Sequence, residues 1–357
     1  MSLRRLGIRD FRCIESAELE FDARCNVISG ENASGKTSLL EAIFFLGRGR
    51  SFRTARNETL IRKSRDELLL TGRLLRADRT QAVGIRFGRE GIEARSGGDR
   101  VSGLAELATI LPVQAIDPEV HRLVEEGPQE RRRYLDWGVF HVEPGFVDHW
   151  RRYQRALRQR NAALRAGAEP RAIRAWDPEL ITAGETVADY RQRYVGHLQP
   201  HIAAVGQRLL GQSVEIGLHR GWSSDLSLAD AVDAAWARDR DRGATHAGPH
   251  RADLSIRVGG EIARDRISRG QQKLVAAALL LGQLRCDAEQ GSALAVLLVD
   301  DPAAELDSAN LERFLHEVLE LPAQLFVTAL DARNPSIESL PAGHMFHVEH
   351  GILTRLV

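Results

Sequence analysis

Eight residues near the N-terminus have the types and spacing of a phosphate-binding loop. They are Gly30-Glu31-Asn32-Ala33-Ser34-Gly35-Lys36-Thr37, followed by Ser38, and they match the pattern G-x-x-x-x-G-K-[ST]. The two glycines allow backbone angles at which successive N–H groups point at one anion. Lys36 can reach the β- and γ-phosphates, and the Thr37 hydroxyl can ligate Mg²⁺. This stretch therefore predicts a nucleoside triphosphate site that uses Mg²⁺.

A second chemical signal is an apolar run that ends in two acids, Asp300 and Asp301. The run Leu294–Val299 is typical of a buried parallel strand. Asp300, at the end of that strand, can hold Mg²⁺ beside the loop, and Asp301 can polarise the attacking water as a general base. The alternative is a strand that ends in a solvated turn, and the presence of a phosphate loop in the same chain makes this alternative the weaker one.

A third signal is Ser268-Arg269-Gly270-Gln271, which opens a long predicted helix. Ser268 is a good N-cap, and that role alone is purely structural. A hydroxyl, a glycine backbone and a helix N-terminus can also bind an anion together. Because one loop already surrounds the phosphates, we expect this second N-terminus to cap the γ-phosphate from a partner subunit.

The elements around these motifs predict an α/β core with a helical insertion. The P-loop helix follows a strand and can end at Gly47, and the pairs Asp117-Pro118 and Asp177-Pro178 are typical of an N-cap followed by proline. We expect strands at 3–9, 17–21, 25–29, 68–76, 81–87, 214–218, 293–299 and 325–328, an extended segment at 111–116 and a glycine-containing turn region at 93–101. We expect helices at 118–125, 128–140, 145–166, 178–210, 226–240, 268–287 and 311–321, and hairpins at 253–264 and 344–355.

The composition is that of an ordinary globular protein. The 357 residues are 43% hydrophobic and 27% charged with a formal net charge of zero, so any DNA-binding surface must be a local patch. Cys13, Cys25 and Cys286 are far apart, which favours a reducing compartment and no zinc site. The N-terminus lacks a signal-peptide pattern, and no apolar run is long enough to span a bilayer. We therefore expect a cytoplasmic protein with no membrane partner.

Four motifs in this order resemble an ABC-type ATPase: the P-loop, Gln114, residues 268–271 and residues 300–307. Further strings resemble the bacterial RecF family, and the resemblance covers residues 3–352. These strings are 47–54, 133–138, 159–164 and 248–254. The resemblance implies an ABC/SMC-head-like P-loop ATPase core, formed by residues 1–112 and 291–357. It also implies an inserted helical arm domain at 113–290 that carries the signature motif at its end.

The resemblance also implies roles for single residues. Gln114 resembles the Q-loop residue that senses Mg²⁺ and the γ-phosphate, although a polar strand residue is the plainer interpretation. Asn32 is similarly placed to contact the γ-phosphate. The segment Glu305-Leu306-Asp307 resembles the D-loop at a dimer interface, and Asp307 is also a good helix N-cap. The implied catalytic set is Lys36, Asp300, Asp301 and Gln114, and the implied Mg²⁺ ligands are Thr37, Gln114 and Asp300.

The sequence departs from the wider ABC pattern at three positions. Asp301 stands where most members have Glu, and its shorter side chain suits slow hydrolysis. Thr328 stands where many members place a switch histidine. Arg269 replaces a commoner small residue of the signature motif, where it can contact phosphate or the partner chain.

Two arginine groups are candidates for DNA contact. Arg151, Arg155 and Arg158 fall on one face of a predicted helix, and Arg53 lies in the arginine-rich loop after the P-loop helix. Phosphate contacts of this kind give salt-dependent binding without sequence preference. A solvated arginine face is the alternative in both places.

The resemblance implies an ATP-dependent DNA-binding protein of recombinational repair and replication restart. It implies an ATP-driven homodimer on double-stranded and gapped DNA, with RecR and RecO as partners, RecA loading as the task and slow, DNA-stimulated ATP hydrolysis as the reset. A transporter's nucleotide-binding subunit is one alternative, but the arm is far longer than a coupling region needs. A head-like ATPase with a nuclease partner is another, but no long heptad run is present.

Overall fold

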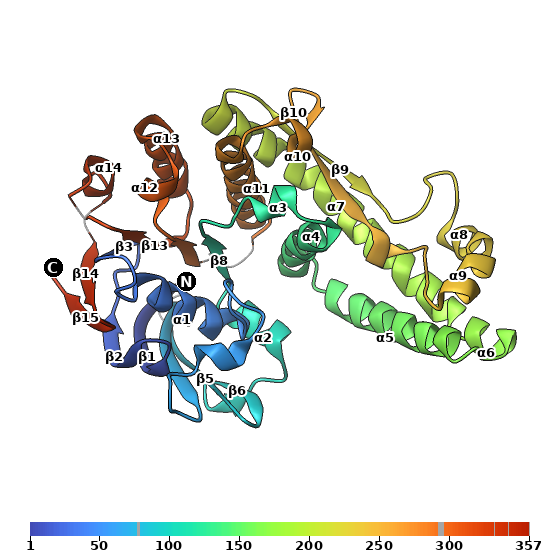
Figure 1. Cartoon of the computed structure of the whole chain (residues 1–357), viewed down its shortest axis with the longest axis horizontal. Coiled ribbons are helices and arrows are strands. Elements are labelled where there is room, and N and C mark those ends of the chain that lie inside the picture. The colour runs from blue at the N-terminus through green and yellow to red at the C-terminus, as the bar shows by residue number, and fades with distance from the viewer. Residues whose placement is uncertain (77–78, 292–295, 332, 342, 357) are drawn as a thin grey trace. The chain divides into compact units, whose positions relative to one another are not determined.

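The computed structural model describes residues 1–76, 79–291, 296–331, 333–341 and 343–356. They form two compact units, a core unit (Met1–Val120 with Ser292–Val357) and an arm unit (His121–Gly291) (Figure 1). Residues 113–120 belong to the core unit and not to the arm as predicted, because β8 (Val113–Ile116) pairs with a strand of the core sheet. Among the described residues, none of the helices has the length and apolarity that crossing a membrane requires.

The core unit contains two six-stranded sheets. The first is antiparallel and has the order β2-β1-β4-β5-β6-β7, with bounds Ile14–Glu20, Ser2–Phe11, Leu68–Arg76, Arg79–Gly88, Gly91–Ser96 and Asp99–Arg100. The second has the order β15-β14-β3-β13-β12-β8; before β8, its strands are Ile352–Arg355, His344–Glu349, Cys25–Ser29, Gln324–Ala329 and Val296–Val299. Its strands run parallel except for β15. The carboxyl ends of β3, β12 and β13 therefore meet at one edge of the sheet, which is where ligands bind in folds of this kind.

Helix α1 (Lys36–Arg48) packs against strands of both sheets. Of its 13 residues, only Thr37 is not buried. A helix that is buried on all sides needs apolar residues on all sides, and Leu39, Leu40, Ile43 and Phe45 supply them. Because the core holds α1 rigidly, the N-terminus of this helix is a fixed point for the loop that precedes it.

The other core helices lie between strands along the chain. They are α2 (Leu104–Ile110), α12 (Pro302–Glu305), α13 (Ser308–Leu319), α14 (Pro335–Glu338) and the 3-10 turn Asn57–Leu60. The predicted strand at 293–299 is described from Val296 onward, so the part of that prediction at 293–295, including Leu294, lies outside the described residues.

The arm unit is built around the 34-residue helix α7 (Asp177–Leu210). This helix packs against α5 (Phe146–Arg165), α11 (Arg269–Glu289) and β9 (Val214–His219). The remaining helices are α3 (Arg122–Glu125), α4 (Pro128–Val142), α6 (Pro170–Arg174), α8 (Leu228–Ala234), α9 (Trp236–Arg242), the 3-10 turn Pro249–Arg251 and α10 (Ala263–Arg266). Strand β10 (Asp253–Val258) pairs with β9 on one side and with β11 (Glu261–Ile262) on the other.

A buried arginine, Arg160, joins three parts of the arm. Its guanidinium donates to Asp177 and to Asp239 at 2.7 Å each, and to the hydroxyl of Thr245 at 2.8 Å. Arg160 and Asp239 are fully buried. Removing one partner of such a network leaves an uncompensated buried charge and costs about 3–5 kcal/mol. Arg160 is therefore part of the arm's interior and not of its basic surface.

Several predicted boundaries were wrong for identifiable reasons. Asp177 is the first helical residue of α7 and not its N-cap, because its carboxylate is committed to Arg160. The carboxylate of Asp117 accepts the N–H of Glu119 within a turn, so the next helix starts only at Arg122. The predicted turn region at 93–101 is the hairpin of β6 and β7, and the predicted helix at 226–240 is the two helices α8 and α9. Helices α2 and α6 were not predicted.

Candidate functional site

The loop between β3 and α1 has a backbone that requires glycine at two positions. Gly30 has a φ of 152°, and a Cβ there would come within 2.3 Å of the Val348 carbonyl oxygen. Gly35 has a φ of 121°, and a Cβ there would lie 3.0 Å from the sulfur of Cys13. Both angles lie in the region that side chains resist. The loop therefore has the shape that the glycine spacing predicts, and the C-terminal hairpin packs against it.

Two side chains of the loop indicate an anion site. The Lys36 ammonium donates to the carbonyl oxygens of Gly30 and Glu31 at 2.6 and 2.9 Å. Burial lowers the pKa of Lys36, and the carboxylates of Asp301 and Asp300 oppose this shift. The Ser34 hydroxyl oxygen is buried and has no hydrogen-bond partner within the described part of the chain. A buried hydroxyl without a partner is costly, so these residues fit a phosphate that completes the hydrogen bonding.

Asp300 directly follows β12 and contacts Thr37 of the P-loop, which is 263 positions earlier in the sequence. The Thr37 hydroxyl lies 3.0 and 2.9 Å from its two carboxylate oxygens. The Thr328 hydroxyl, at the end of β13, donates to one of the same oxygens at 2.7 Å. Hydroxyl and carboxylate oxygens are the ligands that Mg²⁺ prefers, so the residues at this edge fit that ion. The structure thus brings Thr37 and Asp300 together, and their role as Mg²⁺ ligands stays a prediction.

Asp301 has a left-handed backbone with a φ of 47°. Its N–H donates to the Thr328 hydroxyl at 2.8 Å. Burial raises the pKa of Asp301, the charge of Asp300 adds to the rise, and Lys36 opposes it. A carboxylate with a raised pKa beside the lysine of a glycine-rich loop has the chemistry of a general base.

Gln114 lies within β8, three residues before the level of Asp300. It is 6% exposed, and it pairs with Leu297 in the register of β8 and β12. Arg48, the last residue of α1, donates from one nitrogen to the Gln114 side-chain oxygen and from another to the Val113 carbonyl, both at 3.1 Å. The structure therefore holds Gln114 through Arg48. Sequence analysis missed this partner, because a single arginine in an apolar helix has no pattern to reveal it.

The signature segment lies in the arm unit, where Ser268 is the N-cap of α11. Its hydroxyl accepts the N–H of Gln271 at 3.3 Å, and the Gln271 side chain accepts the N–H of Ser268 at 3.1 Å. Residues 268–271 are all exposed, and Nε of Arg269 lies 3.8 Å from a carboxylate oxygen of Glu125. In the core unit, the exposed Asp307 caps α13 by accepting the N–H of Asn310 at 2.9 Å, and Glu305 and Leu306 precede it.

The candidate DNA residues are exposed in both units. Arg151, Arg155 and Arg158 lie on the exposed side of α5. Arg53 lies in a loop that is organised by Glu41, a fully buried carboxylate. Glu41 accepts two hydrogen bonds from Arg12 at 2.8 and 2.9 Å and a third from Ser51. The loop that carries Arg53 is therefore tied to α1.

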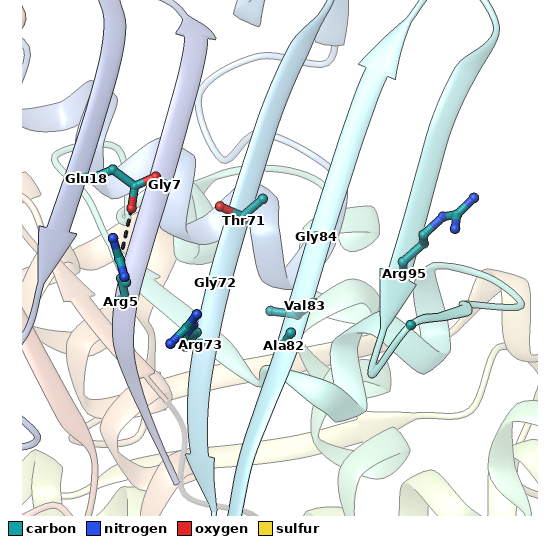
Figure 2. Close-up of a pocket in the computed structure, with 11 residues that line it drawn as sticks. Arg5, Gly7, Glu18, Thr71, Gly72, Arg73, Ala82, Val83, Gly84 and Arg95 are labelled. Carbon is teal, nitrogen blue, oxygen red and sulfur yellow. Dashed lines mark hydrogen bonds and ion pairs between the residues drawn. The ribbon is translucent and has the colours of Figure 1, made fainter.

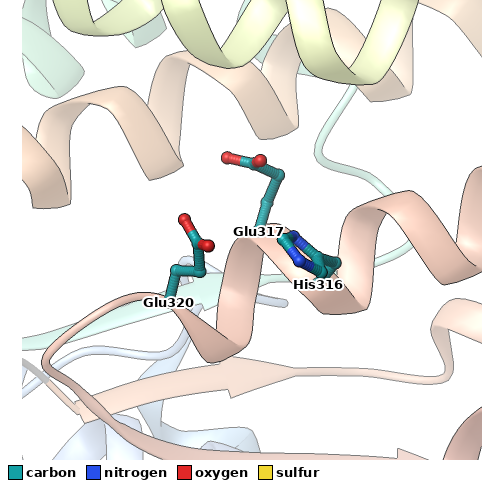
Figure 3. Close-up of side chains that lie close together, drawn as sticks. All are labelled: His316, Glu317 and Glu320. Atoms are coloured by element: carbon teal, nitrogen blue, oxygen red, sulfur yellow. The ribbon is translucent and has the colours of Figure 1, made fainter.

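Two further features do not belong to this site. A shallow pocket of about 450 Å³ lies on the antiparallel sheet, where Arg5, Arg73 and Arg95 project from three strands (Figure 2). His316, Glu317 and Glu320 on α13 bring possible metal-ligand atoms within 4.8 Å of one another (Figure 3). Such clusters of acidic side chains are common without a metal, so we assign no metal to it.

Comparison with known proteins decides the family. The model of the RecF/RecN/SMC N terminal domain matches residues 2–350. The DNA replication and repair proteins RecF of Shewanella frigidimarina and Shewanella piezotolerans are both 41% identical to this chain and aligned over 99% of each sequence. The chain belongs to the RecF family. The resemblance found in the sequence motifs is thereby confirmed.

Solved structures agree with the RecF family's fold. A structure of the recombination mediator protein RecF with ATP, from the RecFOR pathway, has a TM-score of 0.90 and 25% identity, covering 100% of this chain and 98% of the other. An Smc head bound to the C-winged helix domain of ScpA has a TM-score of 0.62 and 16% identity, with coverage of 100% and 98%. The predicted α/β fold, an ABC/SMC-like ATPase, is confirmed.

Proposed function

We propose that this protein is an ATP-dependent DNA-binding protein of recombinational repair and replication restart. The observation that carries the proposal is the meeting of Thr37 with Asp300 beside a lysine-bearing glycine loop. Lys36 and the loop N–H groups would hold the phosphates of ATP, and Thr37 and Asp300 would hold Mg²⁺. The relatives' role in DNA replication and repair, and the structure of RecF with ATP, support this choice of nucleotide and process.

The second half of the site would come from another copy of the chain. Among the residues that the structure describes, a Cβ built on Gly270 would meet nothing within 4 Å, so their packing gives no reason for glycine there. A glycine that the fold itself does not need leaves the backbone open to close approach by a ligand. Together with the exposed N-cap hydroxyl of Ser268, this supports capping of the γ-phosphate by residues 268–271 of a partner subunit. The D-loop, Glu305 to Asp307, would lie at the same interface.

Ser268→Arg should abolish ATP-dependent dimerisation and leave ATP binding by the monomer unchanged. The long side chain would block the phosphate approach, while the P-loop lies on the other unit of the chain. Sedimentation with and without ATP measures dimerisation, and we expect a loss of at least about tenfold in the association constant.

Ser227→Arg is the matched control. Ser227 caps α8 of the same unit through the N–H of Asp230 at 3.1 Å, so the control also loses an N-cap, at about 1 kcal/mol. The control should dimerise normally. If Ser268→Arg weakened ATP binding to the monomer, the role in trans would be refuted.

Helix α5 would supply one DNA-binding surface. A double variant with the charge reversals Arg155→Glu and Arg158→Glu would lose two phosphate contacts. It should bind duplex DNA more weakly, by about the same factor for all DNA sequences. The slope of log affinity against log salt should fall by roughly one per contact removed. Arg238→Glu on α9, an equally exposed arginine, is the control. An unchanged salt slope in the double variant would move the DNA site elsewhere, with Arg53 the next candidate.

The partners would be RecR and RecO, and the task would be to help load RecA at gaps. The deciding experiment is to size the protein with and without ATP, on and off gapped duplex DNA. Dimers that need both ATP and Mg²⁺, and hydrolysis that DNA accelerates, are expected. Capture of a membrane permease together with hydrolysis indifferent to DNA would favour the transporter alternative instead.

A further inference from the structure

Thr328 connects the two acidic residues of the site through a single hydroxyl. It is fully buried, near the end of β13. Its oxygen lies 2.7 Å from a carboxylate oxygen of Asp300 and 2.8 Å from the backbone nitrogen of Asp301. The parallel register, in which Val299 pairs with Val327, brings the residues that follow each of them to the same edge.

The direction of both hydrogen bonds is determined by chemistry. A backbone N–H can only donate, so the Thr328 oxygen accepts from Asp301. The hydroxyl has one proton, and the Asp300 oxygen is the acceptor within reach. The result is a chain that runs from the Asp301 N–H through Thr328 to the Asp300 carboxylate. This chain of hydrogen bonds fixes the Asp300 carboxylate as an acceptor beside Thr37, and it also fixes the backbone of Asp301.

The backbone conformation of Asp301 requires a stabilising hydrogen bond of this kind. Its φ of 47° lies in the left-handed region, which residues other than glycine seldom adopt and which persists only where the surroundings enforce it. This unusual angle sets the direction in which the Asp301 carboxylate leaves the strand end. Loss of the hydrogen bond to Thr328 would free the backbone and the side chain together.

We propose that Thr328 is a positioning residue for hydrolysis, which aligns Asp300 and Asp301 through its hydroxyl. The inference rests on the proposed function, because it assumes that the site hydrolyses ATP. Thr328 acts through the two acidic residues: its buried hydroxyl is already bonded to the carboxylate of Asp300 and to the backbone N–H of Asp301. A switch histidine at this place would reach the γ-phosphate and would titrate. A threonine does neither, so it aligns the acids without adding a pH-dependent charge.

The test compares Thr328→Val with Thr328→Ser in the full-length chain. Valine keeps the shape and removes the hydroxyl, whereas serine keeps the hydroxyl and removes a methyl group. Equilibrium ATP binding and single-turnover hydrolysis with Mg²⁺ are measured for both. We expect the valine variant to bind ATP within about twofold of the parent and to hydrolyse it about 30- to 100-fold more slowly, with the loss in the single-turnover rate constant and not in the affinity for ATP. The serine variant should recover the rate to within about threefold.

Other outcomes would overturn the inference. A valine variant that hydrolyses at the parent rate shows that the hydroxyl does no positioning. A serine variant as slow as valine shows that the methyl group's packing matters instead. A valine variant that loses ATP binding shows that Thr328 serves the nucleotide or the fold. If the parent protein itself binds no ATP, the proposed function fails first and this inference fails with it, so the two failures are distinguishable.

Discussion

Lys36→Met is expected to abolish ATP binding at millimolar nucleotide, and with it ATP-dependent dimerisation. The Lys36 ammonium lies over the loop on the carbonyls of Gly30 and Glu31, at 2.6 and 2.9 Å, with the carboxylates of Asp300 and Asp301 near enough to oppose the lowering of its pKa. Charge-assisted hydrogen bonds to phosphate are about twice as strong as neutral ones, and methionine offers none. A loss of about 10³ in affinity follows, which isothermal titration calorimetry with ATP and Mg²⁺ measures directly.

The fold should tolerate this substitution. Lys36 is 6% exposed, and burial of its ammonium is unfavourable. The variant, in which an apolar side chain of similar length replaces the lysine, should therefore unfold at the same temperature as the parent protein or at a higher one. Lys63→Met is the matched control, because Lys63 is an exposed lysine of the same unit. Unchanged ATP-dependent dimerisation in the Lys36 variant would falsify the assignment of the P-loop.

Local patterns explain why the P-loop and its surroundings could be predicted from the sequence. The bounds predicted for β3 and β4 agree with the structure, and α11 begins after Ser268 as the N-cap pattern predicted. Short-range signals such as glycine spacing, caps and apolar runs determine these elements. The meeting of Thr37 with Asp300 was predictable for a different reason: parallel strands place their carboxyl ends at one edge.

Buried polar networks were not predictable, because one side chain's partner can lie anywhere in the chain. Arg160 lies among several surface arginines in the sequence, yet it is the fully buried one that binds Asp177 and Asp239. Because Asp177 pairs with Arg160, Asp177 does not serve as the N-cap that was predicted for α7. Arg48 and Thr328 are similar cases: each is a polar residue near the end of a largely apolar helix or strand, and only the fold reveals its partners.

Asp301→Asn is expected to slow ATP hydrolysis by about 10³-fold while ATP binding is retained. Asparagine has nearly the shape of aspartate and adopts left-handed angles at least as readily, so the φ of 47° and the hydrogen bond from its N–H to Thr328 should persist. The amide cannot accept a proton from water, so the bound nucleotide should stay intact. ATP-bound dimers should then accumulate on gapped DNA, which gel filtration with and without DNA measures.

The control for this substitution is Asp99→Asn, an exposed carboxylate on β7 of the same unit. It should hydrolyse ATP at the parent rate. An Asp301→Asn variant that also hydrolysed at the parent rate would place the base on another residue.

The pH dependence of hydrolysis should identify the same group. A general base works only in its ionised form, and burial with the neighbouring charge of Asp300 raises the pKa of Asp301. A raised pKa means that the carboxylate takes up a proton at a higher pH than an ordinary aspartate does, so the rate should begin to fall at a higher pH on acidification. The residual rate of Asp301→Asn should lack this limb, because the amide does not titrate there. Loss of the limb with retained ATP binding would separate a base from a residue that only shapes the loop, since shape alone does not depend on a proton.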